Sequence, residues 1–535
     1  MVAIDAICQV VICGAGPVGV TLANLLGAQG IHVLVVDVEP DILNIPRAVG
    51  ICEEGSRILD QAGLLNPDAV SLQEIRNIHF TDASGASVFH VNTEHRNNGY
   101  LTQRTFHQPQ LEQNLRKGLS RYPNVHLHVS TELVGFTDQQ DGVLVELKVG
   151  DQIHNVSCQY LVGCDGSKSP IRKALNLSFT GKTYAQDWLI IDVANNPILD
   201  DEIFFSIDPE RPGITLPLPN GRRRWEFVVK DNDTPAQLFD DAFLTSLLAP
   251  WGDLDQMQVE RKAIYTFHAR TAPSFQKGRV FLAGDAAHIT PPFAGQGMMA
   301  GLRDAQNLAW KVAGVLRGEL TPELLSSYTT ERKPQCHQVI NFAQMIGSFV
   351  LPQDRLRAAI RDSFIKLFKL VGFYRPEEGA RLDRVPNHIN GNWWRNQRVT
   401  RKLGTGVWIE LANVSCSSGL SEQKESRPLD KWLGPSFYVL GWQQDPSSYL
   451  SDATLRNWRQ MGGDFVSLGA DQCSSVPVDL VDDEGVYADY FDNWPVVVLR
   501  PDRMVLARTN WQHLEQVLVE CINQMGAGVK SPSHG

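Results

Sequence analysis

Three observations predict an α/β fold with more than one domain. Short apolar runs end in glycine-containing turns at three places far apart in the chain, as parallel strands do when their carboxyl ends hold a ligand. Alternating or β-branched runs between roughly 188 and 268 indicate an antiparallel sheet. Strand and helix signals restart after a Pro-, Asn-, Arg- and Trp-rich stretch at 376–400, which indicates a separate α/β unit.

The composition is that of an ordinary globular protein. The chain has 535 residues and a formal net charge of −11, which disfavours nucleic acids and anionic membranes as partners. Its nine cysteines form no Cys-x-x-Cys pair, so we expect neither a metal site nor dithiol chemistry. We find no secretion signal and no apolar run long enough to span a membrane, and we expect a cytoplasmic protein.

The first turn predicts a Rossmann-like nucleotide-binding unit. It reads Gly14-Ala15-Gly16-Pro17-Val18-Gly19 and follows a buried apolar run. Gly14 permits the tight turn, Gly16 lets the backbone approach a pyrophosphate, and Gly19 lets the helix pack on the strand. Asp37 ends the next apolar run, where a carboxylate accepts hydrogen bonds from ribose hydroxyls. This motif alone does not separate FAD from NAD.

The third turn favours FAD. The apolar run 280–283 delivers Gly284-Asp285 to its carboxyl end, where Asp285 can hold ribityl hydroxyls. Pro291-Pro292 and Gly295-Gln296-Gly297 then bring the backbone to the edge of a flavin ring. The helix that follows, expected from Gln296 to Arg317 with further helix to about 375, has a dipole that can stabilise a flavin anion.

Several motifs resemble the group A FAD-dependent aromatic hydroxylases, the family of para-hydroxybenzoate hydroxylase and phenol hydroxylase. They are Cys164-Asp165-Gly166, Gly284-Asp285-Ala286-Ala287-His288 and Asp304-Ala305-x-Asn307-Leu308-Ala309-Trp310-Lys311. The resemblance implies bound FAD, NADH or NADPH as transient reductant, and O2 as co-substrate. It also implies that Asp165 serves FAD and nicotinamide binding, and that Arg47 and Gln108 contact the flavin. The alternatives are a surface charge for Arg47 and a helix cap for Gln108.

The predicted site has a cofactor part and a substrate part. Tyr265 or His268 could accept a hydrogen bond from a phenol, and Arg211 or Arg270 could bind a carboxylate through a planar fork, although structural roles remain open for all four. The predicted cofactor-binding residues are Gly14, Gly16, Pro17, Gly19, Asp37, Arg47, Gln108, Asp165, Gly284, Asp285, Ala286, Pro291, Gly295 and Gly297.

The implied reaction is hydroxylation of a small phenolic acid ortho to its hydroxyl. Further resemblance extends along nearly the whole chain and includes Tyr265-Thr266-x-His268-Ala269-Arg270 and Val439-Leu440-Gly441-Trp442. It implies that the substrate is a phenylpropanoid acid, such as 3-(3-hydroxyphenyl)propionate or 3-hydroxycinnamate. Another phenol (resorcinol, a hydroxybenzoate or a polyketide ring) stays open, and so does a flavin-binding redox sensor without turnover.

Three positions carry separate expectations. Met299 stands where the family usually has an Asn that can touch the flavin, so the resemblance implies no such contact at this position. Arg222-Arg223-Arg224 is predicted to be a solvated turn, with a guide for an anionic substrate or nicotinamide phosphate as the alternative. His288 is predicted to be a turn residue bonded to the backbone.

The predicted organisation is discontinuous. The resemblance implies that the last domain is thioredoxin-like and serves dimerisation or scaffolding, so we expect a homodimer; its first strand is expected at 408–411. The boundaries are 1–75, 101–187 and 269–375 for the FAD-binding domain, 76–100 and 188–268 for the substrate-binding β-sheet domain, 376–400 for a connector, 401–525 for the thioredoxin-like domain without Cys-x-x-Cys, and 526–535 for a disordered tail.

Overall fold

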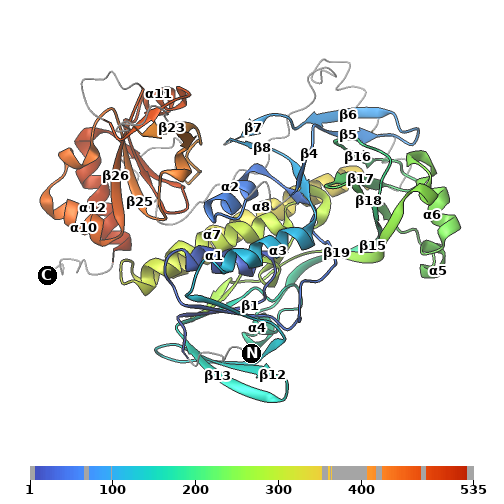
Figure 1. The fold of residues 1–535 in the computed structure, drawn as a ribbon, viewed down its shortest axis with the longest axis horizontal. Helices are drawn as coiled ribbons and strands as arrows, with labels where there is room; N and C mark the ends of the chain where they lie inside the picture. The colour runs from blue at the N-terminus through green and yellow to red at the C-terminus, as the bar shows by residue number, and fades with distance from the viewer. Residues whose placement is uncertain are drawn as a thin grey trace.

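Three β-sheet regions surround a pair of long central helices (Figure 1). The predicted connector at 376–400 lies outside the described residues. So does the predicted tail, except for Gly526, which forms an isolated bridge with Leu320. The computed structural model describes residues 7–65, 71–97, 99–351, 360, 361, 363, 406–416, 425–470 and 478–526.

A six-stranded sheet carries the predicted nucleotide-binding turns. Its four central strands are buried because both faces are covered, which explains why they read as continuous apolar runs. Five strands are parallel, and the edge strand is antiparallel. The order is β10 (Val125–His128), β2 (Val33–Val36), β1 (Val10–Cys13), β14 (Tyr160–Gly163), β21 (Val280–Leu282) and β20 (Gln276–Lys277).

Helices cover one face of this sheet and a small antiparallel sheet covers the other (Figure 1). The helix predicted from Gln296 is α7 (Gly297–Leu316), which packs against α1 (Pro17–Gly27). The remaining elements of this region are α2 (Glu53–Gln61), α3 (Gln108–Leu119), α4 (Pro170–Ala174), α8 (Ser327–Val350), β3 (Gly50–Ile51), β4 (Leu72–Glu74), β7 (Arg96–Asn97), β8 (Tyr100–Leu101), β9 (Arg104–Phe106), β11 (Thr131–Asp138), β12 (Val143–Val149) and β13 (Gln152–Cys158).

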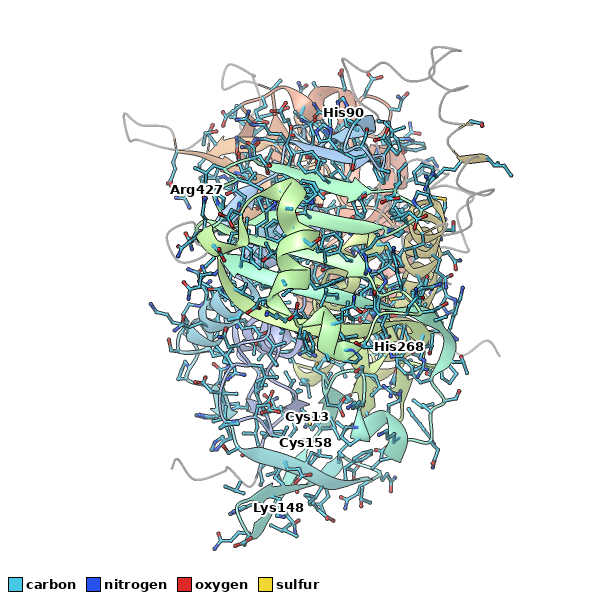
Figure 2. All side chains as sticks on the ribbon, turned by 90° about the vertical axis from the view of Figure 1, so that its right-hand side faces the viewer. Cys13, His90, Lys148, Cys158, His268 and Arg427 are labelled. Atoms are coloured by element: carbon cyan, nitrogen blue, oxygen red, sulfur yellow. The ribbon has the colours of Figure 1, made fainter. Side chains whose placement is uncertain are left out.

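The inserted sheet has eight strands and is antiparallel except for the β16–β5 pair. Helices α5 (Pro235–Leu238) and α6 (Asp241–Leu248) cover its outer face, as Figure 2 shows. The strand order is β22 (His288–Ile289), β19 (Gln258–Thr271), β15 (Thr180–Ala194), β18 (Arg222–Val228), β17 (Gly213–Leu218), β16 (Glu202–Ser206), β5 (Asn77–Thr81) and β6 (Ser87–Asn92).

The prediction of a solvated turn at Arg222-Arg223-Arg224 is wrong. All three arginines belong to β18, and the side chains of Arg223 and Arg224 are fully buried. Arg224 pairs with Asp192 and Arg223 with Asp200, so carboxylates on neighbouring segments compensate the buried charges. The sequence did not reveal these partners because they lie far away in the chain.

The C-terminal region forms its own seven-stranded mixed sheet. The expected strand at 408–411 is absent: in this segment only Trp408 makes an isolated bridge, to Met504. Helices α10 (Asp452–Gln460), α11 (Val486–Phe491) and α12 (Leu514–Met525) pack on the sheet. Its order is β24 (Ser426–Pro428), β23 (Asn413–Cys416), β27 (Leu480–Asp482), β26 (Gly463–Gly469), β25 (Phe437–Trp442), β28 (Val496–Leu499) and β29 (Val505–Thr509).

Buried ion pairs join this C-terminal domain to the rest of the chain. Arg57 of α2 donates through Nε to Asp430 at 2.7 Å, and Arg500 donates through Nη1 to Glu331 of α8 at 3.0 Å. Trp310, near the end of α7, belongs to the apolar core of the C-terminal domain. The interface is therefore continuous packing rather than a flexible link. No helix within the described ranges has the length and apolar character needed to cross a bilayer.

Candidate active site

A cavity of 470 Å³ lies between the two larger sheets of the N-terminal part. On one side it meets the loops that follow β1, β14 and β21, including Gly16, Cys164 and Asp285. On the other side it meets strands β5, β6, β16, β17 and β18. The glycine-rich turns and the inserted sheet therefore line one common space, as expected for a site at the carboxyl ends of parallel strands.

The glycines of the first turn have different neighbours. A Cβ at Gly14, which has φ +107°, would overlap the Cys164 carbonyl, and a Cβ at Gly19 would overlap the Gly14 carbonyl oxygen. A Cβ at Gly16 would meet nothing within 4 Å and would point into open space at the start of α1. Gly14 and Gly19 are thus required by packing, whereas Gly16 leaves room for a ligand beside free helix amides.

A buried charge network holds the third turn. Asp304 of α7 accepts hydrogen bonds from the Gly284 backbone N–H at 3.0 Å, from His288 Nε2 at 2.6 Å and from Arg332 Nε at 2.8 Å. Burial would raise the pKa of Asp304, but the His288 and Arg332 charges hold it below its usual value. The network fixes the position of Asp285, which projects into the cavity.

The prediction that His288 bonds to the backbone is wrong. The His288 side chain pairs instead with Asp304, whose charge helps to raise the pKa of the imidazole well above its usual value despite burial. His288, Asp304 and Cys336 could offer three ligand atoms within 4.8 Å of one another. Both Asp304 oxygens already accept hydrogen bonds, one of them from a guanidinium, so a cation there would have to displace Arg332.

The loop that carries Arg47 is held from two sides. Gln108, the first residue of α3, accepts hydrogen bonds through Oε1 from the backbone N–H groups of Arg47 and Ala48, both at 2.7 Å. Arg224 and Arg261 of the inserted sheet donate to the Pro46 carbonyl oxygen, at 2.5 and 2.9 Å. Arg47 itself lines the cavity. Gln108 therefore positions this loop.

The half of the cavity on the inserted sheet is mostly apolar. Helix α8 adds Phe342 and Ile346, and the aromatic rings of Phe80 and Phe205 stack with centroids 5.1 Å apart. Polar side chains stand at two places, a group near the β6–β9 segment and a single carboxyl group on β18. The apolar lining comprises Ile78, Phe80, Val91, Ile203, Phe205, Ile214 and Leu216, and the polar groups are Asn92, Thr93, His95, Thr102, Gln103, Thr105 and Glu226.

Comparison with known proteins identifies the family. Residues 7–343 match the model of the FAD binding domain family, and residues 420–524 match the HcaD C-terminal domain. The 3-(3-hydroxy-phenyl)propionate/3-hydroxycinnamic acid hydroxylase of Burkholderia cenocepacia is 35% identical over 522 residues, which cover 94% of each chain. The enzyme of the same name from Escherichia coli is 33% identical over 531 residues, covering 97% of this chain and 94% of that enzyme. The chain belongs to the FAD-binding aromatic hydroxylases.

Solved structures of low sequence identity share the fold. The flavin-dependent monooxygenase PieE, in complex with FAD and substrate, superposes with a TM-score of 0.78 at 18% identity, covering 98% of this chain and all of that one. Aklavinone-11 hydroxylase, in a ternary complex with FAD and aklavinone, superposes with a TM-score of 0.75 at 22% identity, covering 97% of this chain and all of the other. The C-terminal domain is thus part of an architecture found in other aromatic hydroxylases.

The site residues present are compatible with FAD. Gly16, Gly166 and Gly295 each face open space where an added Cβ would meet nothing within 4 Å. Asp165 has a buried Oδ1 that accepts no hydrogen bond within the described part of the chain, and burial raises the pKa of its carboxyl group. The side chain of Asp285 is exposed to the cavity, and the charges of Arg47 and His288 act on its carboxyl group. Asp285, which lines the cavity, therefore has acceptor capacity for ligand hydroxyls, whereas Asp165 lies between the lining residues Cys164 and Gly166 without lining the cavity itself.

The Asp37 carboxylate accepts hydrogen bonds from the backbone N–H groups of Ala15 and Glu39 at 2.6 and 2.9 Å, which ties the end of β2 to the first turn.

The predicted cofactor residues fall into two groups, according to whether they line the cavity. Those that line the cavity are Gly16, Pro17, Arg47, Gln108, Asp285, Gly295 and Gly297, and those that flank its lining are Gly14, Gly19, Asp37, Asp165, Gly284, Ala286 and Pro291.

Met299 does not face the cavity. Its side chain is 1% exposed and packs beside Gly55 of α2, while the neighbouring Met298 lines the cavity. At position 299 this chain therefore offers a core contact between α7 and α2, with no polar contact to a ligand.

The structure does not bring the predicted substrate residues to the cavity lining. Tyr265 bonds to Arg261, and His268 lies 3.1 Å from the Thr183 hydroxyl in an exposed pair at the end of β19. Figure 2 shows His268 and His90 toward opposite edges of the inserted sheet. Arg211 pairs with Asp233 at 2.7 Å, and Arg270 donates to Thr183 at 2.6 Å.

Sequence reasoning missed two residues of this site. Asp304 stands in a motif that the resemblance used, but nothing in that motif assigns it to the Gly284 turn. Glu226 stands between Trp225 and Phe227 in a predicted strand, where neighbouring residues point to opposite faces. That alternation was the available signal: Trp225 and Phe227 belong to the core under α5 and α6, so Glu226 must face the other way.

Proposed function

We propose that this protein is a single-component FAD-dependent monooxygenase that uses NADH or NADPH and O2 to hydroxylate a phenolic acid ortho to its hydroxyl. We infer that the substrate is 3-(3-hydroxyphenyl)propionate and that 3-hydroxycinnamate is also accepted. Hydroxylation of either acid gives the corresponding 2,3-dihydroxy product. The relatives named for this reaction, 33–35% identical over nearly the whole length, support the choice. Other phenols, and a redox sensor without turnover, are the outcomes against which the proposal is tested.

The observation that carries this proposal is the continuity of the cavity. Asp285 and Gly16, which suit the ribityl and pyrophosphate parts of FAD, share one space with an apolar chamber of the inserted sheet. Bound FAD, once reduced, supplies the oxygen-activating chemistry. The chain must then place an aromatic ring at the flavin edge and exclude water, which suits the lining residues Phe80, Phe205 and Ile214.

The test uses the purified protein with its bound flavin. We expect a yellow protein whose oxidation of NADH or NADPH and uptake of O2 accelerate when 3-(3-hydroxyphenyl)propionate is added, with a catechol as product. A panel of hydroxylated phenylpropionates, cinnamates and benzoates ranks the substrates by coupled catechol formation. Oxidation that no phenol changes would favour the redox sensor, and a protein that takes up no FAD would exclude both functions.

The proposed ribityl contact has its own test. Asp285→Ala should lower the retained FAD at least tenfold, because the carboxylate that projects into the cavity is lost while the Asp304 network stays intact. The matched control is Asp141→Ala, an exposed carboxylate outside the cavity lining, which should keep its flavin. Equal flavin content in the two purified variants would contradict the role of Asp285.

We also propose that the C-terminal domain is thioredoxin-like and acts as a scaffold or dimerisation element. The strand order β26-β25-β28-β29, with α10 between β25 and β26 and α12 after β29, supports the fold. The buried Arg57–Asp430 and Arg500–Glu331 pairs support a scaffold within one chain. Light scattering on the whole protein tests the homodimer.

A further inference from the structure

One carboxyl group in the substrate half of the cavity has no assigned role. Glu226 lies on β18, opposite Ile190 of β15 and Ile214 of β17. Its residue is 8% exposed, and that exposed surface belongs to the cavity lining. The apolar residues Ile214, Leu216 and Ile203 line the same chamber. A charged group in such surroundings needs a partner, since an unpaired buried carboxylate is costly.

The protein supplies a nearby positive charge but no hydrogen bond to this carboxylate within the described part of the chain. Arg224 Nη1 lies 3.6 Å from Glu226 Oε1, beyond hydrogen-bond distance, and the same guanidinium donates through Nε and Nη2 to Asp192 at 2.6 and 2.8 Å. Within the described part of the chain, no hydrogen-bond donor reaches the Glu226 carboxylate. Its oxygens are therefore free to accept a hydrogen bond from a molecule in the cavity.

The surrounding charges define the state of this carboxyl group. Arg224 on β18, Asp192 on β15 and Arg261 on β19 are the charged groups that act on it, while Tyr265 bonds to Arg261 on the same face. Burial raises the pKa of Glu226 and Asp192 adds to the rise, whereas the two arginines oppose it. A carboxylate with a raised pKa is a stronger proton acceptor than an ordinary one.

We propose that Glu226 is the catalytic residue that binds the substrate's phenol hydroxyl and accepts its proton. This rests on the proposed function. The hydroxyl donates a hydrogen bond to the carboxylate, and its O–H bond then breaks as the proton moves to a Glu226 oxygen. The electron pair left on the phenol oxygen enriches the ortho carbon that receives the oxygen atom. FAD, NAD(P)H and O2 supply the oxidation, so Glu226 changes only its protonation.

Ligand binding to the oxidised, flavin-loaded protein tests the hydroxyl contact without turnover. Dissociation constants are measured for 3-(3-hydroxyphenyl)propionate and for 3-phenylpropionate, which lacks the hydroxyl. The unchanged protein should prefer the phenol at least tenfold. Glu226→Leu should bring the two constants within about twofold of each other, because the acceptor is gone. A Leu variant that keeps the full preference would overturn the proposal.

Glu226→Gln separates acceptance of the proton from simple hydrogen bonding, and it keeps the side-chain volume. Its amide oxygen still accepts a hydrogen bond, so the preference for the phenol should stay within about threefold of the original. The rate of catechol formation at saturating substrate should fall at least tenfold, because the amide does not take the proton. An unchanged rate would overturn the assignment.

Tyr265→Phe tests the rival acceptor, because Tyr265 lies on the same sheet face as Glu226 but outside the cavity lining. It should leave both the preference and the rate within twofold. Loss of the preference in Tyr265→Phe, together with its retention in Glu226→Leu, would transfer the role to Tyr265. If no phenol accelerates NAD(P)H oxidation while the binding preference still depends on Glu226, the proposed function fails and the hydroxyl contact stands.

Discussion

The two sides of the cavity are built by different means. On the side of the glycine-rich turns, the surface is formed by glycines and backbone amides. A buried network around Asp304 fixes the turn at Gly284. On the side of the inserted sheet, the surface consists of side chains that point inward from separate strands. The first side depends on local sequence, whereas the second depends on which face of each strand is turned inward.

The largest expected effect comes from adding one methyl group to each of two glycines in the first turn, which tests whether a glycine is required by packing or by the ligand. Gly19→Ala places a methyl group on the Gly14 carbonyl oxygen. Because the overlapped atom belongs to the backbone, the free energy of unfolding of the flavin-free protein should fall by about 3 kcal/mol, the upper end of the usual cost of overpacking. Gly16→Ala meets no protein atom and should melt like the unchanged flavin-free protein. It should nevertheless bind FAD at least tenfold more weakly. Thermal unfolding and flavin titration separate the two effects, and equal melting temperatures would contradict the packing argument.

Asp304→Asn tests the network behind the third turn. The variant leaves the Arg332 and His288 charges without their carboxylate in a buried site, which typically costs about 3–5 kcal/mol. Urea unfolding measures the loss, and flavin content should fall with it. Arg222→Ala is the control, because its pair with Glu260 is partly exposed and should contribute about 1 kcal/mol or less. Similar losses of unfolding free energy in both variants would contradict the role of Asp304 as the centre of a buried charge network.

The interface with the C-terminal domain predicts a dependence on pH. Arg500 and Lys311 lower the pKa of Glu331 to about 2, below the ordinary value of 4.5. The unfolded chain therefore binds more protons between these two values, so stability is present above pH 4.5 and is lost as the pH falls toward 2. Glu331→Gln should flatten this part of the curve of unfolding free energy against pH. A curve as steep as that of the unchanged protein would contradict the assignment.

The smallest effect is expected at Arg211. Its guanidinium pairs with Asp233 outside the cavity lining, so Arg211→Ala should change kcat/KM for the phenolic acid less than twofold. Steady-state kinetics on the panel of acids measures this value. A large rise in KM confined to carboxylated phenols would return Arg211 to the role that the sequence suggested.

The sequence located the glycine-rich turns because their signals are local. Gly14 and Gly19 act within one turn, and Asp285 follows its own strand directly, so spacing alone locates them. Tyr265, His268 and Arg211 were plausible by residue type, yet their partners come from tertiary packing. Tyr265 shares the sheet face of Glu226 but bonds to Arg261 outside the cavity lining, and Arg211 pairs with Asp233. The burial of Arg223 and Arg224 likewise depends on Asp200 and Asp192, whose proximity the sequence did not reveal.

The split ion pairs at the C-terminal interface constrain how such enzymes can be recombined. A chimera joined within 376–400 would take Asp430 and Arg500 from one parent and Arg57 and Glu331 from the other. Parents that differ at any one of these four positions would yield offspring with an unpaired charge in a buried interface. Productive domain exchange among these hydroxylases should therefore require coordinated changes in α2 and α8, even though neither helix lies in the exchanged segment.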